Sequence, residues 1–144
     1  MPATEPFCKL IGINPNDLSK EENILLEIDL FTQICEELKE EFRSQHTNYF
    51  RTMKFNKEME DAMLEASYVR LIIQDILLTK EYDLPGLARY ADTYEDVVQE
   101  VVTGRNISPS ANFLRKIIEL HKSVRQDLYN VIIKKIVTRY LAVA

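Results

Sequence analysis

Apolar residues between positions 19 and 44 recur in alternating steps of four and three, the spacing of one face of an α-helix. This stripe consists of Ile24, Ile28, Phe31, Cys35, Leu38 and Phe42. Asn16 or Ser19 can cap the helix, because both carry a short side-chain acceptor ahead of the stripe. The pattern predicts a long amphipathic helix over about 19–44.

A second helical pattern covers about 57–80, with Asn56 as its cap. Its predicted inward positions are Met59, Met63, Ala66, Val69, Ile73, Ile76 and Leu77. Residues 45–55 fit either a continued helix or a turn. The two helices predict an antiparallel pair that buries its own core. The first stripe also fits a homodimer seam, formed by Ile24, Ile28, Phe31, Leu38 and Phe42 of two copies.

Four shorter helices are predicted in the rest of the chain. Asp83 is expected to cap one that ends near Ala91, and Thr93 to cap the next, which Gly104 terminates. Ser108 followed by Pro109 predicts the start of a helix that runs to about His121. Ser123 is expected to cap a last helix, whose apolar positions are Leu128, Val131, Ile132, Ile136 and Tyr140.

Composition agrees with an all-α fold. The 144 residues are 46% hydrophobic and include only three glycines and five prolines, which leaves few positions for turns. We predict a tail over 1–15, a helical dimerisation and support region over 16–80, a compact unit over 81–123 and a C-terminal helix over 124–144. These segments are expected to pack as a single domain.

Charge is distributed unevenly along the chain. Residues 1–104 hold 10 Lys+Arg against 21 Asp+Glu, whereas residues 105–144 hold 8 against 2, and the whole chain carries −5. This split fits neutralisation of one half by the other, head-to-tail assembly of copies, or an anionic partner at the basic C-terminal part.

Several chemistries lack their sequence signals. No apolar run approaches the ~20 residues of a membrane span, and no secretory leader is recognisable, so we expect a cytoplasmic protein without membrane contact. Cys8 and Cys35 do not resemble a disulfide framework, and Cys35 is expected to be a buried free thiol. His46 and His121 lack a metal ligand at helical spacing, and no phosphate loop or nucleophile elbow occurs. We therefore expect no metal, no cofactor and no enzymatic activity.

The spacing over residues 87–104 is typical of two helices that meet at a tight turn. Leu87-Ala88 allows close approach of the helices, Val98 and Val101 fill the joint, and Gly104 can adopt the left-handed conformation after the second helix. Over about residues 84–120 the chain resembles the phage repressor-like helix-turn-helix family of the Cro and lambda-repressor type. Asp92 replaces the glycine usual in the family's turn, and an Asp tolerates the same conformation.

The resemblance implies a transcriptional regulator that binds duplex DNA with its second helix in the major groove. The implied base-contacting residues are Tyr94, Glu95, Asp96 and Gln99. The implied phosphate-contacting residues are Arg89, Arg105, Asn106, Ser108 and Lys116. Gln can read adenine, and a carboxylate can accept a hydrogen bond from cytosine.

The charge of the second helix points to an alternative. Glu95, Asp96 and Glu100 lie on the helix that would enter the groove, where phosphates repel carboxylates. A helix-turn-helix scaffold with this acidic surface also fits a protein–protein interaction module that binds a basic partner.

Overall fold

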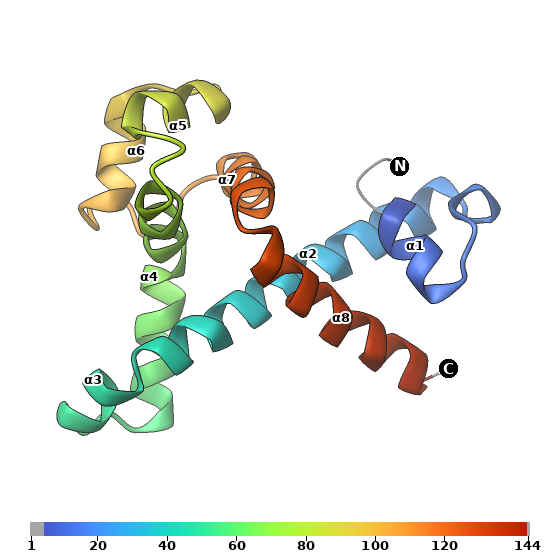
Figure 1. The fold of residues 1–144 in the computed structure, drawn as a ribbon, viewed down its shortest axis with the longest axis horizontal. Coiled ribbons are helices and arrows are strands. Elements are labelled where there is room, and N and C mark those ends of the chain that lie inside the picture. The colour runs from blue at the N-terminus through green and yellow to red at the C-terminus, as the bar shows by residue number, and fades with distance from the viewer. Residues whose placement is uncertain (1–4, 144) are drawn as a thin grey trace. The chain divides into compact units, whose positions relative to one another are not determined.

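The computed structural model describes residues 5–143, which form eight α-helices, one 3-10 helix and no strand (Figure 1). The predicted all-α class is confirmed. The helices are α1 (Glu5–Ile11), η1 (Pro15–Asp17), α2 (Lys20–Gln45), α3 (Thr47–Thr52), α4 (Lys57–Leu78), α5 (Leu84–Tyr90), α6 (Glu95–Val102), α7 (Ala111–Val124) and α8 (Gln126–Val143). The chain divides into two compact units, the described part of residues 1–38 and 127–144 (unit 1) and residues 39–126 (unit 2).

Unit 1 contains α1, η1, most of α2 and α8. Residues 5–11, expected as part of a tail, are helical, and the buried Phe7 ring meets Tyr140 edge-on at 5.1 Å. Arg139 of α8 donates to Glu37 of α2 at 2.7 Å, and the Tyr140 hydroxyl donates to Asp29, just over two turns earlier in α2. These contacts hold α8 against α2 within unit 1.

The start of α2 is a capping box. The Glu22 amide donates to the Ser19 hydroxyl at 3.1 Å, and the Ser19 amide donates to the Glu22 carboxylate at 3.0 Å. The Ser19 amide, followed by its hydroxyl, holds the pKa of Glu22 below its ordinary value. Of the two predicted caps, Ser19 is therefore the one that starts the helix.

Unit 2 is organised around α4. This helix packs against α6 and α7, while α5 packs against α6 and α7 (Figure 1). Its core is formed by buried apolar side chains from all four helices, among them Leu64, Val69, Ile72, Ile73, Ile76, Leu87, Ala88, Val98, Val101, Phe113, Leu114, Ile117, Ile118 and Leu120. At the other end of α4, Arg43 of α2 contacts Glu60 and Asp61, and Lys39 contacts Glu65. The joined ends of α2 and α4 are thus antiparallel, as predicted.

Three predicted helix starts need correction. Ser110, not Ser108, caps α7, since its hydroxyl accepts from the Phe113 amide at 3.1 Å. The residue before α6 is Tyr94, not Thr93. Ser123 lies inside α7, where its hydroxyl donates to the Leu120 carbonyl, and so it caps nothing. In each case the expected cap has the right side chain, but the helix begins one or two residues later than predicted.

Some predicted inward positions face solvent. Met59 and Ala66 of α4 and Val131 of α8 are exposed. Within the α2 stripe, Leu38 and Phe42 are buried, whereas Ile24 and Ile28 are 44% and 56% exposed. Leu38 and Phe42 therefore cannot belong to the predicted dimer seam, because a side chain already buried in its own chain offers no surface to a second copy.

The compact units also cut across the predicted segments. The segment 16–80 contributes to both units, and its border at 80–81 falls inside unit 2. α2 itself passes from one unit to the other. Sequence patterns alone predict a border after α4, because the turn signals cluster there.

The position of the α7 cap predicts the behaviour of two serines. Ser110→Ala should lower the free energy of unfolding by about 1 kcal/mol, because it leaves a helix N–H without an acceptor. Ser108→Ala should change it by less than about 0.5 kcal/mol, as expected for an exposed loop position. Urea unfolding followed by circular dichroism measures both values. Equal losses in the two variants would contradict the assignment of Ser110.

Candidate nucleic-acid interface

The turn between α5 and α6 is built from local backbone hydrogen bonds. Asp83 starts α5 by accepting from the Gly86 amide at 2.8 Å. At the other end of α5, the Thr93 amide donates to the Ala88 carbonyl at 2.9 Å, and Asp92 has φ = 55°. Asp92 thus adopts the left-handed conformation expected for it, and a turn of four residues separates α5 from α6.

α6 has a buried face and a solvent face. Val98 is fully buried and Val101 is 2% exposed, where the helix packs on α5 and α4. On the opposite side Glu95, Asp96 and Gln99 are exposed, and Tyr94, just before the helix, is 82% exposed. The structure therefore brings the four predicted base-contacting residues together on one accessible surface, which we call the α6 face.

The loop after α6 is held closely to the helix. Gly104 has φ = 79°, as predicted for a residue that ends a helix. The Asn106 amide donates to the Glu100 carbonyl at 3.0 Å, and the Asn106 side chain accepts from the Ser108 amide at 3.0 Å. The Ser108 amide is therefore occupied, and Ser108 lies in a loop rather than at a helix N-terminus.

The predicted phosphate-contacting residues differ in accessibility. Arg89, Arg105 and Ser108 are exposed, whereas Asn106 and Lys116 are half-buried. Arg89 belongs to α5, Arg105 to the loop and Lys116 to α7. Within the described residues, neither arginine nor Lys116 forms an ion pair, so their charges remain available.

Sequence reasoning missed a further cation beside this surface. A methyl group built on Gly104 would lie 3.3 Å from Nη1 of Arg70, a residue of α4. The Arg70 side chain is exposed and also lacks an ion pair in the described chain. Its guanidinium therefore lies beside the α6–α7 loop that carries Arg105. No local pattern could reveal this, because α4 and the loop meet only in the folded chain.

A buried polar network ties α7 to α4. Nε2 of the fully buried His121 lies 2.6 Å from the Asp75 carboxylate, and Arg125 donates to both oxygens of Asp75 at 2.9 and 2.7 Å. Because an unpaired charge in this position would be costly, the three residues stabilise one another. The network holds α7, the helix that follows the loop, against α4, and no local sequence pattern predicts it.

In residues 5–143, no group of three or more His, Cys, Asp or Glu side chains is placed to hold a metal ion. None of the helices in this range combines the length and apolar character of a membrane span. Cys8 and Cys35 are buried free cysteines, as expected for Cys35.

Comparison with protein families, with characterised proteins and with solved structures finds no match to this chain. The resemblance to the phage repressor-like family therefore rests on residues 84–120 of this sequence.

The left-handed turn residue allows a direct test of the α5–α6 geometry. Asp92→Val should lower the free energy of unfolding by about 1–2 kcal/mol, because a branched side chain is disfavoured at positive φ. Asp92→Gly should leave it unchanged or raise it. Gln99→Val, in the exposed middle of α6, should cost only about 0.5 kcal/mol in helix propensity. The midpoints of urea unfolding rank the stabilities of the three variants. An Asp92→Val variant as stable as the wild type would contradict the left-handed conformation of Asp92.

Proposed function

We propose that this protein is a transcriptional regulator that binds duplex DNA through α5 and α6. The observation that supports the proposal is the orientation of α6 in unit 2. It is a separate short helix after a tight turn, with Val98 and Val101 buried beneath it and the α6 face open to solvent. A helix presented in this way fits the width of the major groove.

The surrounding cations support the proposal. Arg70, Arg89 and Arg105 are exposed on three different elements, and none is neutralised within the described residues. Together with Lys116, Asn106 and Ser108 they form a plausible set of phosphate contacts, which position a protein on DNA without reading its sequence.

On this proposal, the α6 face reads the base sequence of the DNA. Gln99 can donate to and accept from adenine, while Glu95 or Asp96 can accept from the amino group of cytosine. The carboxylates lower the affinity for DNA as a polyanion, since each must approach the phosphates. Direct base contacts must therefore supply a large part of the binding energy.

The same carboxylates favour a second candidate function. Glu95, Asp96 and Glu100 are exposed and form no ion pair within the described chain. An unneutralised acidic helix is a suitable surface for a basic protein partner. In this alternative the helix-turn-helix scaffold serves protein–protein interaction, and the arginines play no part.

A duplex-binding titration over salt concentration separates these functions. With three or four phosphate contacts per protomer, the slope of log K against log salt should be about −3. Glu95→Lys with Asp96→Lys should raise affinity for non-specific duplex by about tenfold, because two repulsive charges become attractive. Fluorescence anisotropy of a labelled duplex measures both quantities.

The control variant is Glu41→Lys with Glu58→Lys, which makes the same change of net charge elsewhere in unit 2. This variant should gain less affinity than the α6 variant. Absence of binding at low salt, or a response that does not depend on salt, would rule out DNA as the partner. Loss of capture of a basic polypeptide by the α6 variant, without any DNA binding, would support the alternative.

We also propose that the protein acts as a homodimer through the start of α2. Ile24, Leu25 and Ile28 are 44%, 66% and 56% exposed and form a single apolar surface by their helical spacing. Unit 1 also exposes carboxylates at Glu21 and Glu22 and a cation at Lys134 of α8. Exposed charges of both signs within one unit suit a two-fold contact between identical copies. Two half-sites on DNA would need such a dimer.

The oligomeric state tests this second part. Leu25→Glu with Ile28→Glu should convert a dimer into a monomer in sedimentation experiments at micromolar concentration, because two charges would be buried in the contact. Leu78→Glu is the matched control, since Leu78 of unit 2 is 78% exposed and outside the proposed surface. A wild-type chain that is monomeric up to about 100 μM, a concentration at which contacts of about −5.5 kcal/mol assemble, would contradict the dimer.

The compartment follows from these proposals. A DNA-binding regulator with two free, buried cysteines fits a reducing compartment, and we place the protein in the cytoplasm.

A further inference from the structure

The corner between α2 and α4 carries an unusual local composition. Residues 42–57 contain four cations, Arg43, Arg51, Lys54 and Lys57, and no carboxylate. Three aromatic residues, Tyr49, Phe50 and Phe55, lie between them. Basic and aromatic side chains in alternation are typical of surfaces that bind phosphate groups joined to planar rings.

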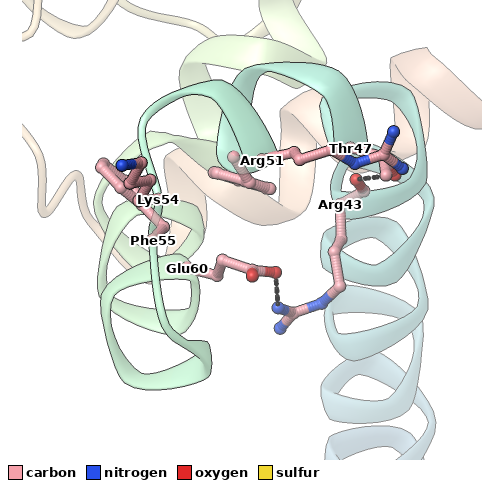
Figure 2. Close-up of a pocket in the computed structure, with 7 residues that line it drawn as sticks. Arg43, Thr47, Arg51, Lys54, Phe55 and Glu60 are labelled. Atoms are coloured by element: carbon pink, nitrogen blue, oxygen red, sulfur yellow. Dashed lines mark hydrogen bonds and ion pairs between the residues drawn. The ribbon is translucent and has the colours of Figure 1, made fainter.

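The structure forms a pocket from this segment (Figure 2). The cavity has a volume of about 470 Å³, within the range of about 300–1,000 Å³ typical of small-molecule sites. It is lined by Arg43, Thr47, Phe50, Arg51, Lys54, Phe55 and Glu60. All seven residues belong to unit 2, where α2 ends, α3 turns the chain and α4 begins.

Arg43, one of the lining cations, is neutralised by carboxylates. Arg43 donates to Glu60 at 2.7 Å, an ion pair visible in Figure 2, and also contacts Asp61 and Glu40. The hydrogen bond to Asp61 comes first among the contacts that hold the pKa of Arg43 above its ordinary value. Glu60 is thus neutralised by its partner, and this ion pair forms a rigid polar wall.

Two other lining cations carry uncompensated positive charge. Arg51 and Lys54 are exposed and form no ion pair within the described residues. The side-chain hydroxyl of Thr47 donates to backbone carbonyls of α2, so its oxygen can still accept a hydrogen bond. Because Arg43 is already paired with carboxylates, the uncompensated lining cations are Arg51 and Lys54, and an anion is the complementary ligand.

Aromatic rings form the apolar part. Phe50 is buried and stacks on Phe55, with ring centroids 5.7 Å apart and planes inclined by 27°. Phe55 is half-buried, and Tyr49, which packs edge-on against it at 5.9 Å, is 45% exposed. Phe55 and Tyr49 therefore retain ring surface that a planar ligand can cover.

The backbone adds a constraint at Lys54. Its φ of 57° is left-handed, and the Phe55 amide donates to the Phe50 carbonyl at 3.0 Å to close the end of α3. Glycine meets this geometry without strain, whereas lysine does not. Lys80 has the same conformation after α4, at φ = 63°, but lies outside this pocket. The two lysines therefore share the same unfavourable backbone conformation, but only Lys54 lines the pocket.

We propose that the α2–α4 corner is a binding site for a ligand of the nucleotide class, with its phosphate on Lys54 and its ring against Phe55, which Figure 2 shows beside each other, whereas the Arg51 guanidinium lies beside Thr47 and adds only to the positive field. This inference is independent of the proposed DNA contact through α6, which lies at the opposite end of α4. The phosphate can belong to a free nucleotide or to the 5′ end of a short single strand, since both present the same chemistry.

The test uses the full chain and NMR titration of its amide signals. AMP and CMP should shift the signals of residues 43–60, whereas adenosine and inorganic phosphate should each bind at least about tenfold more weakly, because each lacks one half of the contact. A 5′-phosphorylated trinucleotide forms the second arm. Tighter binding of the trinucleotide assigns the site to strand ends, and tighter binding of AMP assigns it to free nucleotides.

Matched glycine variants separate binding from folding. Lys54→Gly and Lys80→Gly should both leave the melting temperature unchanged or raise it by about 2–4 °C. Only Lys54→Gly should lose affinity for AMP, by about tenfold, as for the loss of one charge-assisted hydrogen bond. Arg51→Gln should lose less affinity than Lys54→Gly, because Arg51 acts on the phosphate only through its charge at a distance.

The proposal is overturned if no nucleotide shifts these signals at 10 mM, a concentration at which even contacts of about −3 kcal/mol are populated. It is also overturned if Lys54→Gly binds AMP as wild type does, or if inorganic phosphate binds as tightly as AMP. Duplex binding through α6 would survive each of these results, because its salt dependence is measured without nucleotide.

Discussion

Burial of Val98 and Val101 is the constraint on which the candidate DNA-binding surface depends. α6 has only eight residues, too few for a helix to be stable in water by itself. Each buried valine contributes about 1.5–3 kcal/mol when it leaves water. Once these two side chains lie against α5 and α4, helical geometry forces Glu95, Asp96 and Gln99 to the outside. The acidic surface is therefore a direct consequence of how the helix is stabilised.

Features set by near neighbours in the chain could be predicted from the sequence. Asn56 and Asp83 cap their helices by accepting amides three residues later, and Gly104 and Asp92 adopt positive φ where a helix has to end. In these cases the residue type and a separation of three or four positions determine the geometry. The α5–α6 turn belongs to the same class, and for this reason the predicted base-contacting residues share one surface.

Features that depend on distant parts of the chain could not be predicted. Leu38 and Ile24 occupy equivalent positions in the repeat of the α2 stripe, yet one is fully buried and the other is 44% exposed, since periodicity identifies a face but not its partner. His121 and Asp75 are 46 positions apart, and Arg70 meets Gly104 only through the packing of α4. Ser108 and Ser110 are chemically equivalent as caps, so local sequence could not decide between them.

The acidic α6 face has a consequence for selectivity under the proposed function. Non-specific DNA binding derives almost entirely from phosphate contacts, so carboxylates that approach the backbone weaken it directly. At a matching site, Gln99 and the carboxylates gain hydrogen bonds to bases, which offset part of that repulsion. The four unpaired cations, Arg70, Arg89, Arg105 and Lys116, outnumber Glu95, Asp96 and Glu100 by only one, which leaves little net attraction for arbitrary sequence. Such a protein would bind most DNA weakly and would owe its occupancy of a target to the ratio of specific to non-specific affinity.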